Sequence, residues 1–307
     1  MVLKKIGLTG ATGMLGRHIK FALEKAGSHV IGVSRYAASD CNVVSWDLEN
    51  WLSMTQMDNL FAGVGAVVHA GAMVPRATDL IDDGRMFNAN VRACINLVNW
   101  AESRSIPIVH VSGAIVYAEP DREFIVEEAQ VGWSGLGGSY GLSKVLAEDV
   151  FSRYKKQNLK LALVRPSSIY GHGLAPDKMI SRFLSAASQD ETITLTHPLD
   201  DKIDFVHAAD VASAIVAILE AGAWDVFNIA SGSRASVREI AQLCIAASGR
   251  GRIVINGLQN GEPSSRFSLN TEKAKKLLGW QSTIDICQGL ALMLSKSLDI
   301  KTEHDLA

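Results

Sequence analysis

Apolar and polar positions follow two different rhythms along this chain. Short apolar runs rich in β-branched residues are typical of buried parallel strands, whereas apolar residues spaced three and four apart are typical of helices. The two patterns alternate, which predicts an α/β fold with a doubly wound parallel sheet covered by helices. Strands are predicted at 5–9, 30–34, 66–70, 108–112, 161–164 and 225–229, and helices at 15–26, 85–103, 139–157, 209–221 and 237–248.

The composition narrows the range of partners. A formal net charge of -2, with 20% charged residues, provides no basic stripe for nucleic acid. No signal segment opens the chain, and no apolar stretch is long enough to span a bilayer. We therefore expect a cytoplasmic protein that binds neither nucleic acid nor membrane. The cysteines lie far apart without metal-ligand spacing, which predicts reduced thiols and no metal site: Cys41, Cys94, Cys244 and Cys287.

A glycine-rich segment joins the first predicted strand to the first predicted helix. Gly10 permits a tight turn, Gly13 lets the backbone approach a pyrophosphate, and Gly16 lets the helix pack close to the strand. The start of the helix adds free amides and a favourable dipole for an anion. This context predicts a dinucleotide site in a Rossmann-type fold, with Thr12, Met14 and Leu15 among its contacts. The full segment is Thr9-Gly10-Ala11-Thr12-Gly13-Met14-Leu15-Gly16.

The alternating pattern loosens after residue 165, where proline, glycine and serine become frequent. Further helices are predicted at 177–188 and 271–278. We expect residues 1–165, with roughly 204–230, to form the dinucleotide-binding domain, and residues 166–203 and 231–307 to form a smaller C-terminal substrate-binding lobe.

The end of the second predicted strand bears on the choice between NAD and NADP. An acid is expected there when the adenosine ribose carries free hydroxyls, but the chain has Ser34 and Arg35. Because a guanidinium binds phosphate in a bidentate manner, Arg35 could hold the 2′-phosphate of NADP. We therefore favour NADP as the cofactor, with NAD as the alternative. The other interpretation of Arg35 is a solvated arginine in a loop. Asp47-Leu48 could approach the adenine and Ala70-Gly71-Ala72 the dinucleotide, although either segment could be an ordinary loop.

A tyrosine and a lysine lie four residues apart at the start of a predicted helix. The spacing puts Tyr140 and Lys144 on one face. A free phenol has a pKa near 10, and a nearby ammonium favours the phenolate, which makes the phenol usable as an acid or base. Lys144 can also hold the nicotinamide ribose. The pair predicts proton transfer beside the dinucleotide.

These features together resemble the extended short-chain dehydrogenases/reductases, in the group of nucleotide-sugar epimerases and reductases. The resemblance covers nearly the whole chain and implies hydride exchange at the nicotinamide C4, with Tyr140 moving a hydroxyl proton. It also implies cofactor contacts at Asn90 and Pro166, and a homodimer through the helices near Arg85 and Ser139. The matching segments are Asn88-Ala89-Asn90-Val91, Val111-Ser112, Val116-Tyr117, Arg165-Pro166-Ser167-Ser168-Ile169-Tyr170-Gly171, Asp204-Phe205-Val206-His207, Asn228-Ile229-Ala230-Ser231-Gly232 and Leu278-Gly279-Trp280.

One departure from the family pattern concerns the catalytic hydroxyl. The family carries a serine or threonine four residues before the tyrosine of its Val-Tyr pair. Counting back from Tyr117, this chain has Gly113 at that position, which we expect to face the substrate. Ser112 can replace it only if the strand end bulges or kinks, and otherwise bonds locally. In family dehydratases, two acidic residues follow this serine or threonine directly and take part in the elimination of water. This chain has Ala114 and Ile115 at those two positions, and neither side chain can transfer a proton. Simple hydride chemistry remains: 4-epimerisation, ketone reduction or alcohol oxidation, not dehydration.

The substrate side is less complete than the resemblance implies. The resemblance implies two arginines that bind a nucleoside diphosphate. Ile203 stands at the first of these positions, and Arg266 matches the second. Arg266 could instead pair with Glu262 on the surface. A nucleotide sugar is the expected substrate, and a smaller or uncharged carbonyl is the alternative. Another alternative is a dinucleotide-sensing protein without catalysis. We expect His69, His207 and Asp210 to be structural.

Overall fold

The computed structural model describes residues 5–36, 43–75, 82–155, 159–196, 198–257 and 267–295. Its centre is a seven-stranded sheet in which every neighbouring pair of strands is parallel. The order β10-β6-β5-β4-β1-β2-β3 places β1 beside both β2 and β4, the arrangement of a doubly wound fold. The predicted fold class is therefore confirmed. The strands are β1 (Lys5–Thr9), β2 (His29–Ser34), β3 (Val43–Ser45), β4 (Ala66–His69), β5 (Ile108–Val111), β6 (Leu161–Pro166) and β10 (Val226–Ile229).

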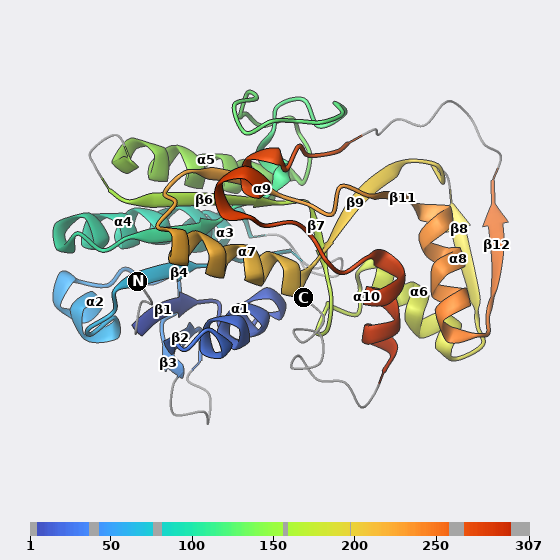
Figure 1. Ribbon diagram of the computed structural model, residues 1–307, viewed down its shortest axis with the longest axis horizontal. Helices are drawn as coiled ribbons and strands as arrows, with labels where there is room; N and C mark the ends of the chain where they lie inside the picture. The colour runs from blue at the N-terminus through green and yellow to red at the C-terminus, as the bar shows by residue number, and fades with distance from the viewer. Residues whose placement is uncertain are drawn as a thin grey trace.

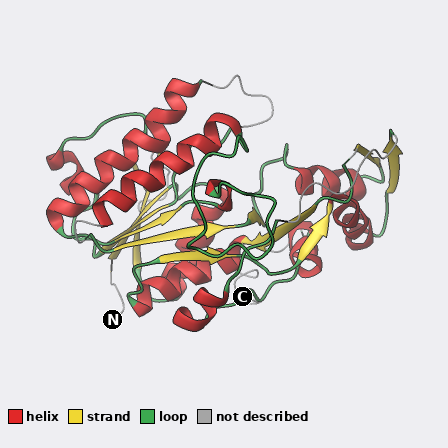
Figure 2. Cartoon of the chain, turned by 90° about the horizontal axis from the view of Figure 1, so that it is seen from above, coloured by secondary structure: helices red, strands yellow, loops and turns green. Residues whose placement is uncertain are grey.

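Helices cover both faces of this sheet (Figures 1 and 2). On one face, apolar side chains of α1, α7 and α9 form a core with residues of the strands. A second core on the other face is formed with α2, α4 and α5. The central strands are buried on both sides, which explains why their sequences are continuous apolar runs. The helices are α1 (Met14–Lys25), α2 (Met54–Leu60), α4 (Ala93–Arg104), α5 (Gly138–Lys155), α7 (Ala208–Ala221) and α9 (Glu272–Leu278).

The helix predicted at 85–103 is not continuous. It consists of α3 (Asp83–Phe87), a π-helical turn (Asn88–Arg92) and α4. Within the turn, the amide of Ala93 donates to the carbonyl of Asn88, five residues earlier. Such a turn inserts one extra residue and is frequent at functional sites. Apolar spacing alone does not reveal it.

Most of the remaining elements gather at one end of the molecule, on the right in Figure 1, while β7 lies nearer the middle. A separate apolar cluster fills them, with Tyr170, Ile180, Ile240 and Leu290 buried in it. Helices α6 and α8 lie close to the predicted positions, whereas α10 and the short strands were not predicted. These elements are β7 (Ser168–Tyr170), α6 (Met179–Ser188), β8 (Thr192–Thr196), β9 (Lys202–His207), β11 (Arg234–Ser236), α8 (Val237–Ser248), β12 (Arg252–Asn256) and α10 (Ile286–Leu294).

Two polar residues predicted to be structural lie at the amino-terminal end of α7 and connect it to its neighbours. His207 caps α7 by accepting a hydrogen bond from the amide of Ala209. The buried carboxylate of Asp210 accepts hydrogen bonds from Ser282, Thr283 and Ile284, which fixes the segment before α10. Among the described residues, the helices are all too short or too polar to cross a membrane.

Candidate active site

Several of the predicted site residues lie at the carboxyl-terminal edge of the central sheet. Gly10 follows β1, Arg35 follows β2, Ala70 follows β4 and Ser112 follows β5. All these strands are parallel, so their carboxyl ends share one edge. In open α/β sheets, ligands bind outside this edge, where the strand order reverses.

The glycine turn after β1 depends on the absence of side chains. Gly10 has a φ of +72°, and a Cβ there would lie 2.8 Å from the backbone of Gly71. A Cβ on Gly16 would lie 2.0 Å from the carbonyl oxygen of Gly10. Gly13 is the exposed N-cap of α1; it lacks a capping side chain, and the first turn contains no acid. The exposed helix start therefore fits the pyrophosphate of a dinucleotide.

Ser34 and Arg35 lie next to this turn. The hydroxyls of Ser34 and Thr12 share a hydrogen bond at 2.8 Å. The side chain of Arg35 is 45% exposed and lies 3.8 Å from a carboxylate oxygen of Asp47. Ser34 and Arg35 thus lie beside the turn, and the arginine has an acidic neighbour.

The loop after β4 packs directly against the glycine turn. A Cβ on Gly71 would lie 3.0 Å from Leu48 and 3.1 Å from the hydroxyl of Thr9. The backbone amide of Gly71 donates to that hydroxyl at 3.0 Å. The segments 47–48 and 70–72 therefore meet at the turn.

Tyr140 and Lys144 lie in the first two turns of α5. Lys144 is 5% exposed, and its Nζ donates a hydrogen bond to the carbonyl of Val111 at 3.1 Å. The same Nζ lies 5.9 Å from the centroid of the half-buried Tyr140 ring. The cation is thus held at the end of β5, close to the phenol.

Asn90 lies in the π-helical turn and binds two neighbouring segments. Its side-chain oxygen accepts from the amide of Met73 at 2.7 Å, and its Nδ2 donates to the Met73 carbonyl and to Ser143. The Ser143 hydroxyl in turn donates to the carbonyl of Tyr140 at 2.7 Å. The side chain of Asn90 thus joins the loop after β4 to α5. Its predicted contact with the cofactor stays a prediction. Sequence reasoning missed Ser143.

The position of the missing hydroxyl is now defined. Gly113 has extended backbone, with a φ of 172°, and a Cβ there would come no closer than 3.7 Å to Ile115. The backbone at Gly113 is therefore extended and does not need a glycine. The kink at the strand end that would let Ser112 take over the catalytic role is not seen at this residue. The Ser112 hydroxyl is buried and has no hydrogen-bond partner among the described residues.

A buried polar network behind the site was not predicted. Arg165, near the end of β6, donates to both carboxylate oxygens of Glu148 on α5 and to the hydroxyl of Tyr117. That hydroxyl donates to Asn228 on β10. A charged residue at an otherwise apolar strand end was the available signal. The network fixes α5 to the strand that ends in the buried Pro166.

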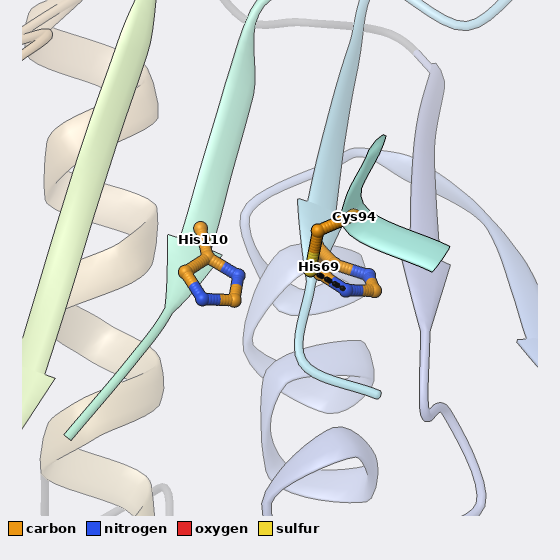
Figure 3. A group of neighbouring side chains, drawn as sticks. All are labelled: His69, Cys94 and His110. Carbon is orange, nitrogen blue, oxygen red and sulfur yellow. Dashed lines mark hydrogen bonds between the residues drawn. The ribbon is translucent and has the colours of Figure 1, made fainter. Parts of the chain in front are cut away.

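Three buried side chains near Lys144 could be mistaken for a metal centre (Figure 3). The candidate ligand atoms of His69, Cys94 and His110 lie within 4.8 Å of one another. However, the two imidazoles are stacked at an interplanar angle of 23°, so their in-plane lone pairs do not converge on one point. Both His69 nitrogens also have other neighbours, Thr9 at 2.7 Å and Cys94 at 3.5 Å. The group is better described as part of the buried core, in which His69 and Cys94 are hydrogen-bonded to each other.

The substrate side is only partly described. Lys202 is exposed and Ile203 half-buried on β9. Arg266, the predicted phosphate clamp, lies outside the described residues.

The sheet order and the glycine turn define the class of protein: a Rossmann-type α/β fold whose sheet edge fits a dinucleotide. The model of the NAD dependent epimerase/dehydratase family matches residues 6–230. The chain belongs to this family, among the extended short-chain dehydrogenases/reductases.

Curated relatives and solved structures extend along most of the chain. A dTDP-4-dehydro-6-deoxy-D-allose reductase of Streptomyces sp is 26% identical over 263 residues, which cover 79% of this chain and 81% of the relative. A UDP-glucose 4-epimerase of Neisseria meningitidis serogroup C is 23% identical over 327 residues, covering 93% and 95%. The structure of MoeE5 in complex with UDP-glucose and NAD superimposes with a TM-score of 0.80 at 22% identity, covering 99% of this chain and all of that one.

Proposed function

We propose that this enzyme moves a hydride between nicotinamide C4 and a secondary alcohol or ketone of a nucleotide sugar, as a 4-epimerase or a 4-ketoreductase. The observation that carries the proposal is the position of Tyr140 and Lys144 on the sheet edge that also bears the glycine turn. A reductase and a 4-epimerase of nucleotide sugars among its relatives support the same chemistry.

The chain's own residues would bind the dinucleotide and move the proton. The amides at the start of α1, after Gly13, would hold the pyrophosphate. Tyr140 would give a proton to the substrate oxygen during reduction and take it back during oxidation. The Lys144 cation, held on the Val111 carbonyl, would stabilise the phenolate and bind the nicotinamide ribose. When bound, the nicotinamide supplies or accepts the hydride.

Elimination of water does not fit the residues beside Tyr140. Ala114 and Ile115 form the start of a 3₁₀ turn after Gly113 and carry no acid or base. A dehydratase needs an acid to protonate the leaving hydroxyl. The proposal therefore excludes dehydration and predicts products that retain every oxygen of the sugar.

NADP is the proposed cofactor, with NAD as the alternative. Arg35 is exposed beside the Thr12–Ser34 hydrogen bond, where it can pair with a 2′-phosphate. Its neighbour Asp47 and the NAD found in the MoeE5 complex favour the alternative. The homodimer and the cytoplasmic location stay predictions.

A non-nucleotide carbonyl is the second candidate substrate, because Ile203 stands where an arginine would bind a diphosphate. Native mass spectrometry of freshly purified protein separates the candidates, since the retained dinucleotide and any retained nucleotide sugar each have a defined mass. Incubation with UDP- and dTDP-sugars should then give 4-epimers or 4-alcohols. Dehydrated or decarboxylated sugars as the products would contradict the proposed reaction. Failure to exchange hydride with any alcohol or ketone would favour a dinucleotide-sensing protein.

A further inference from the structure

A continuous chain of buried polar contacts crosses the core between the glycine turn and the π-helical turn. The amide of Gly71 donates to the hydroxyl of Thr9 at 3.0 Å, and that hydroxyl lies 2.7 Å from Nδ1 of His69. On the other side of the imidazole, Nε2 lies 3.5 Å from Sγ of Cys94, and the thiol donates to the carbonyl of Asn90 at 3.0 Å. The side chains of Thr9, His69, Cys94 and Asn90 are all nearly inaccessible to solvent.

The direction of every hydrogen bond follows from counting protons. A thiol has one hydrogen, which Cys94 donates to Asn90, so Nε2 of His69 must donate to the sulfur. Nδ1 of the neutral imidazole is then an acceptor. The Thr9 hydroxyl, which accepts from Gly71, has its hydrogen free for Nδ1. Each donor in the chain therefore has one acceptor.

The chain continues to the catalytic helix through the side chain of Asn90. Its amide binds both backbone groups of Met73 and donates to Ser143, whose hydroxyl donates to the carbonyl of Tyr140. Asn90 lies inside the π-helical turn, where the regular ladder of backbone hydrogen bonds is interrupted. The Cys94 thiol gives the Asn90 carbonyl a partner in this turn.

We propose that His69 and Cys94 are positioning residues, which act through Asn90 and Ser143 to hold the start of α5, and with it Tyr140, at a fixed place relative to the glycine turn. The proposal rests on the proposed function, because it gives Tyr140 the role of acid and base. The residues touch neither cofactor nor substrate; they set the geometry of groups that do.

Both positioning residues keep their protons over a wide pH range. Burial, and secondarily the Lys144 cation, lowers the pKa of His69 to about 3. Burial also raises the pKa of Cys94 to about 12, with Lys144 opposing the shift. The imidazole therefore stays neutral and the thiol stays protonated, as the hydrogen-bond directions require.

The matched variants Cys94→Ala and Cys94→Ser test the proposal. Alanine removes the thiol, whereas a serine hydroxyl can still accept from His69 and donate to Asn90. For Cys94→Ala we expect kcat per dinucleotide-binding site to fall about tenfold, since a misplacement of about 1 Å can cost 100-fold. The dissociation constant of the dinucleotide should change little, because the glycine turn is untouched. Cys94→Ser should recover most of kcat.

A purely structural role would give a different result. Both variants would then lower the midpoint of thermal unfolding while kcat per site stayed at the wild-type value, and the proposal would be wrong. Equal losses of kcat in the alanine and serine variants would also overturn it, because the hydrogen bonds would not be the cause.

Thr9→Val and Thr9→Ser repeat the comparison at the other end of the chain, in case Cys94→Ala does not fold. Where Cys94→Ala folds, the double variant Thr9→Val/Cys94→Ala tests whether the contacts act as one unit. Its fold-loss of kcat should then be smaller than the product of the two single fold-losses. A fold-loss equal to that product would contradict the proposal. Tyr140→Phe serves as the reference. Full activity in that variant refutes the proposed function, whereas its inactivity with unchanged Cys94 and Thr9 variants refutes only the positioning role.

Discussion

The ammonium of Lys144 lies 5.9 Å from the centroid of the Tyr140 ring. Its hydrogen bond to the Val111 carbonyl, at the end of β5, ties the helix that carries both residues to the central sheet. Because Lys144 is buried, its charge is weakly screened by solvent. The pair is thus fixed both to its helix and to the strand edge where a dinucleotide would bind.

Replacing Lys144 by methionine should remove the charge while keeping a side chain of similar length. We expect kcat to fall roughly 100- to 10,000-fold, the usual contribution of a positioned proton-transfer system, with weaker dinucleotide binding through the lost ribose contact. Lys144→Arg should not restore activity, because a planar guanidinium does not fit a site built for an ammonium. Steady-state kinetics and fluorescence titration measure both effects. Wild-type kcat in Lys144→Met would contradict the role of the cation.

Gly113→Ser should restore the hydroxyl that the family pattern leads us to expect. The extended backbone accepts any residue, and the nearest atom to an added Cβ would be 3.7 Å away, so the variant should fold normally. A hydrogen bond to the developing charge on the substrate oxygen would contribute about 1.5–3 kcal/mol, which predicts a rise in kcat/KM of about tenfold or more. Gly113→Ala adds the Cβ without the hydroxyl and should show no rise. Equal losses in both variants would mean that the substrate itself occupies the space.

Arg35→Ala should discriminate between the two cofactors. If the guanidinium binds the 2′-phosphate, NADP should bind about 10- to 100-fold more weakly, as expected for the loss of a charge-assisted hydrogen bond, while NAD binding should be nearly unchanged. Asp47→Asn removes the acidic neighbour 3.8 Å away and should strengthen NADP binding. Isothermal titration with each dinucleotide measures these changes. Equal effects of Arg35→Ala on both cofactors would contradict the preference for NADP.

Asp58 should contribute to the acid sensitivity of the fold. The hydrogen bond from Arg104, and then that from Trp100, lowers the pKa of Asp58 from 3.8 to about 2. The folded protein thus binds the proton less tightly than the unfolded chain, so this stabilisation is present above pH 3.8 and is lost as the pH falls towards 2. Asp58→Asn should flatten this part of the pH dependence of the free energy of unfolding in urea. If the free energy of unfolding of Asp58→Asn fell with pH as steeply as that of the wild type, the bonds of Asp58 to α4 would not be the source of this stabilisation.

The elements around the dinucleotide turn could be predicted because they depend on local signals. Buried parallel strands give continuous apolar runs, and the turn at Gly10 needs glycine for its positive φ. The internal contacts of the site have no such signal. His69 and Cys94 lie 25 residues apart and meet only after β4 and α4 pack together, and the π-helical turn at Asn90 preserves the apolar spacing that predicts an ordinary helix. Short elements such as β3 and α2 were missed because a few residues do not define a period.

Hydride transfer by Tyr140→Phe, measured in a single turnover through the absorbance of reduced nicotinamide, tests the central claim most directly. The phenylalanine ring keeps the shape of the side chain and removes only the hydroxyl. The account predicts that the variant binds the dinucleotide as tightly as the wild type but transfers hydride at least about 100-fold more slowly. Transfer at the wild-type rate on the same substrate would contradict it.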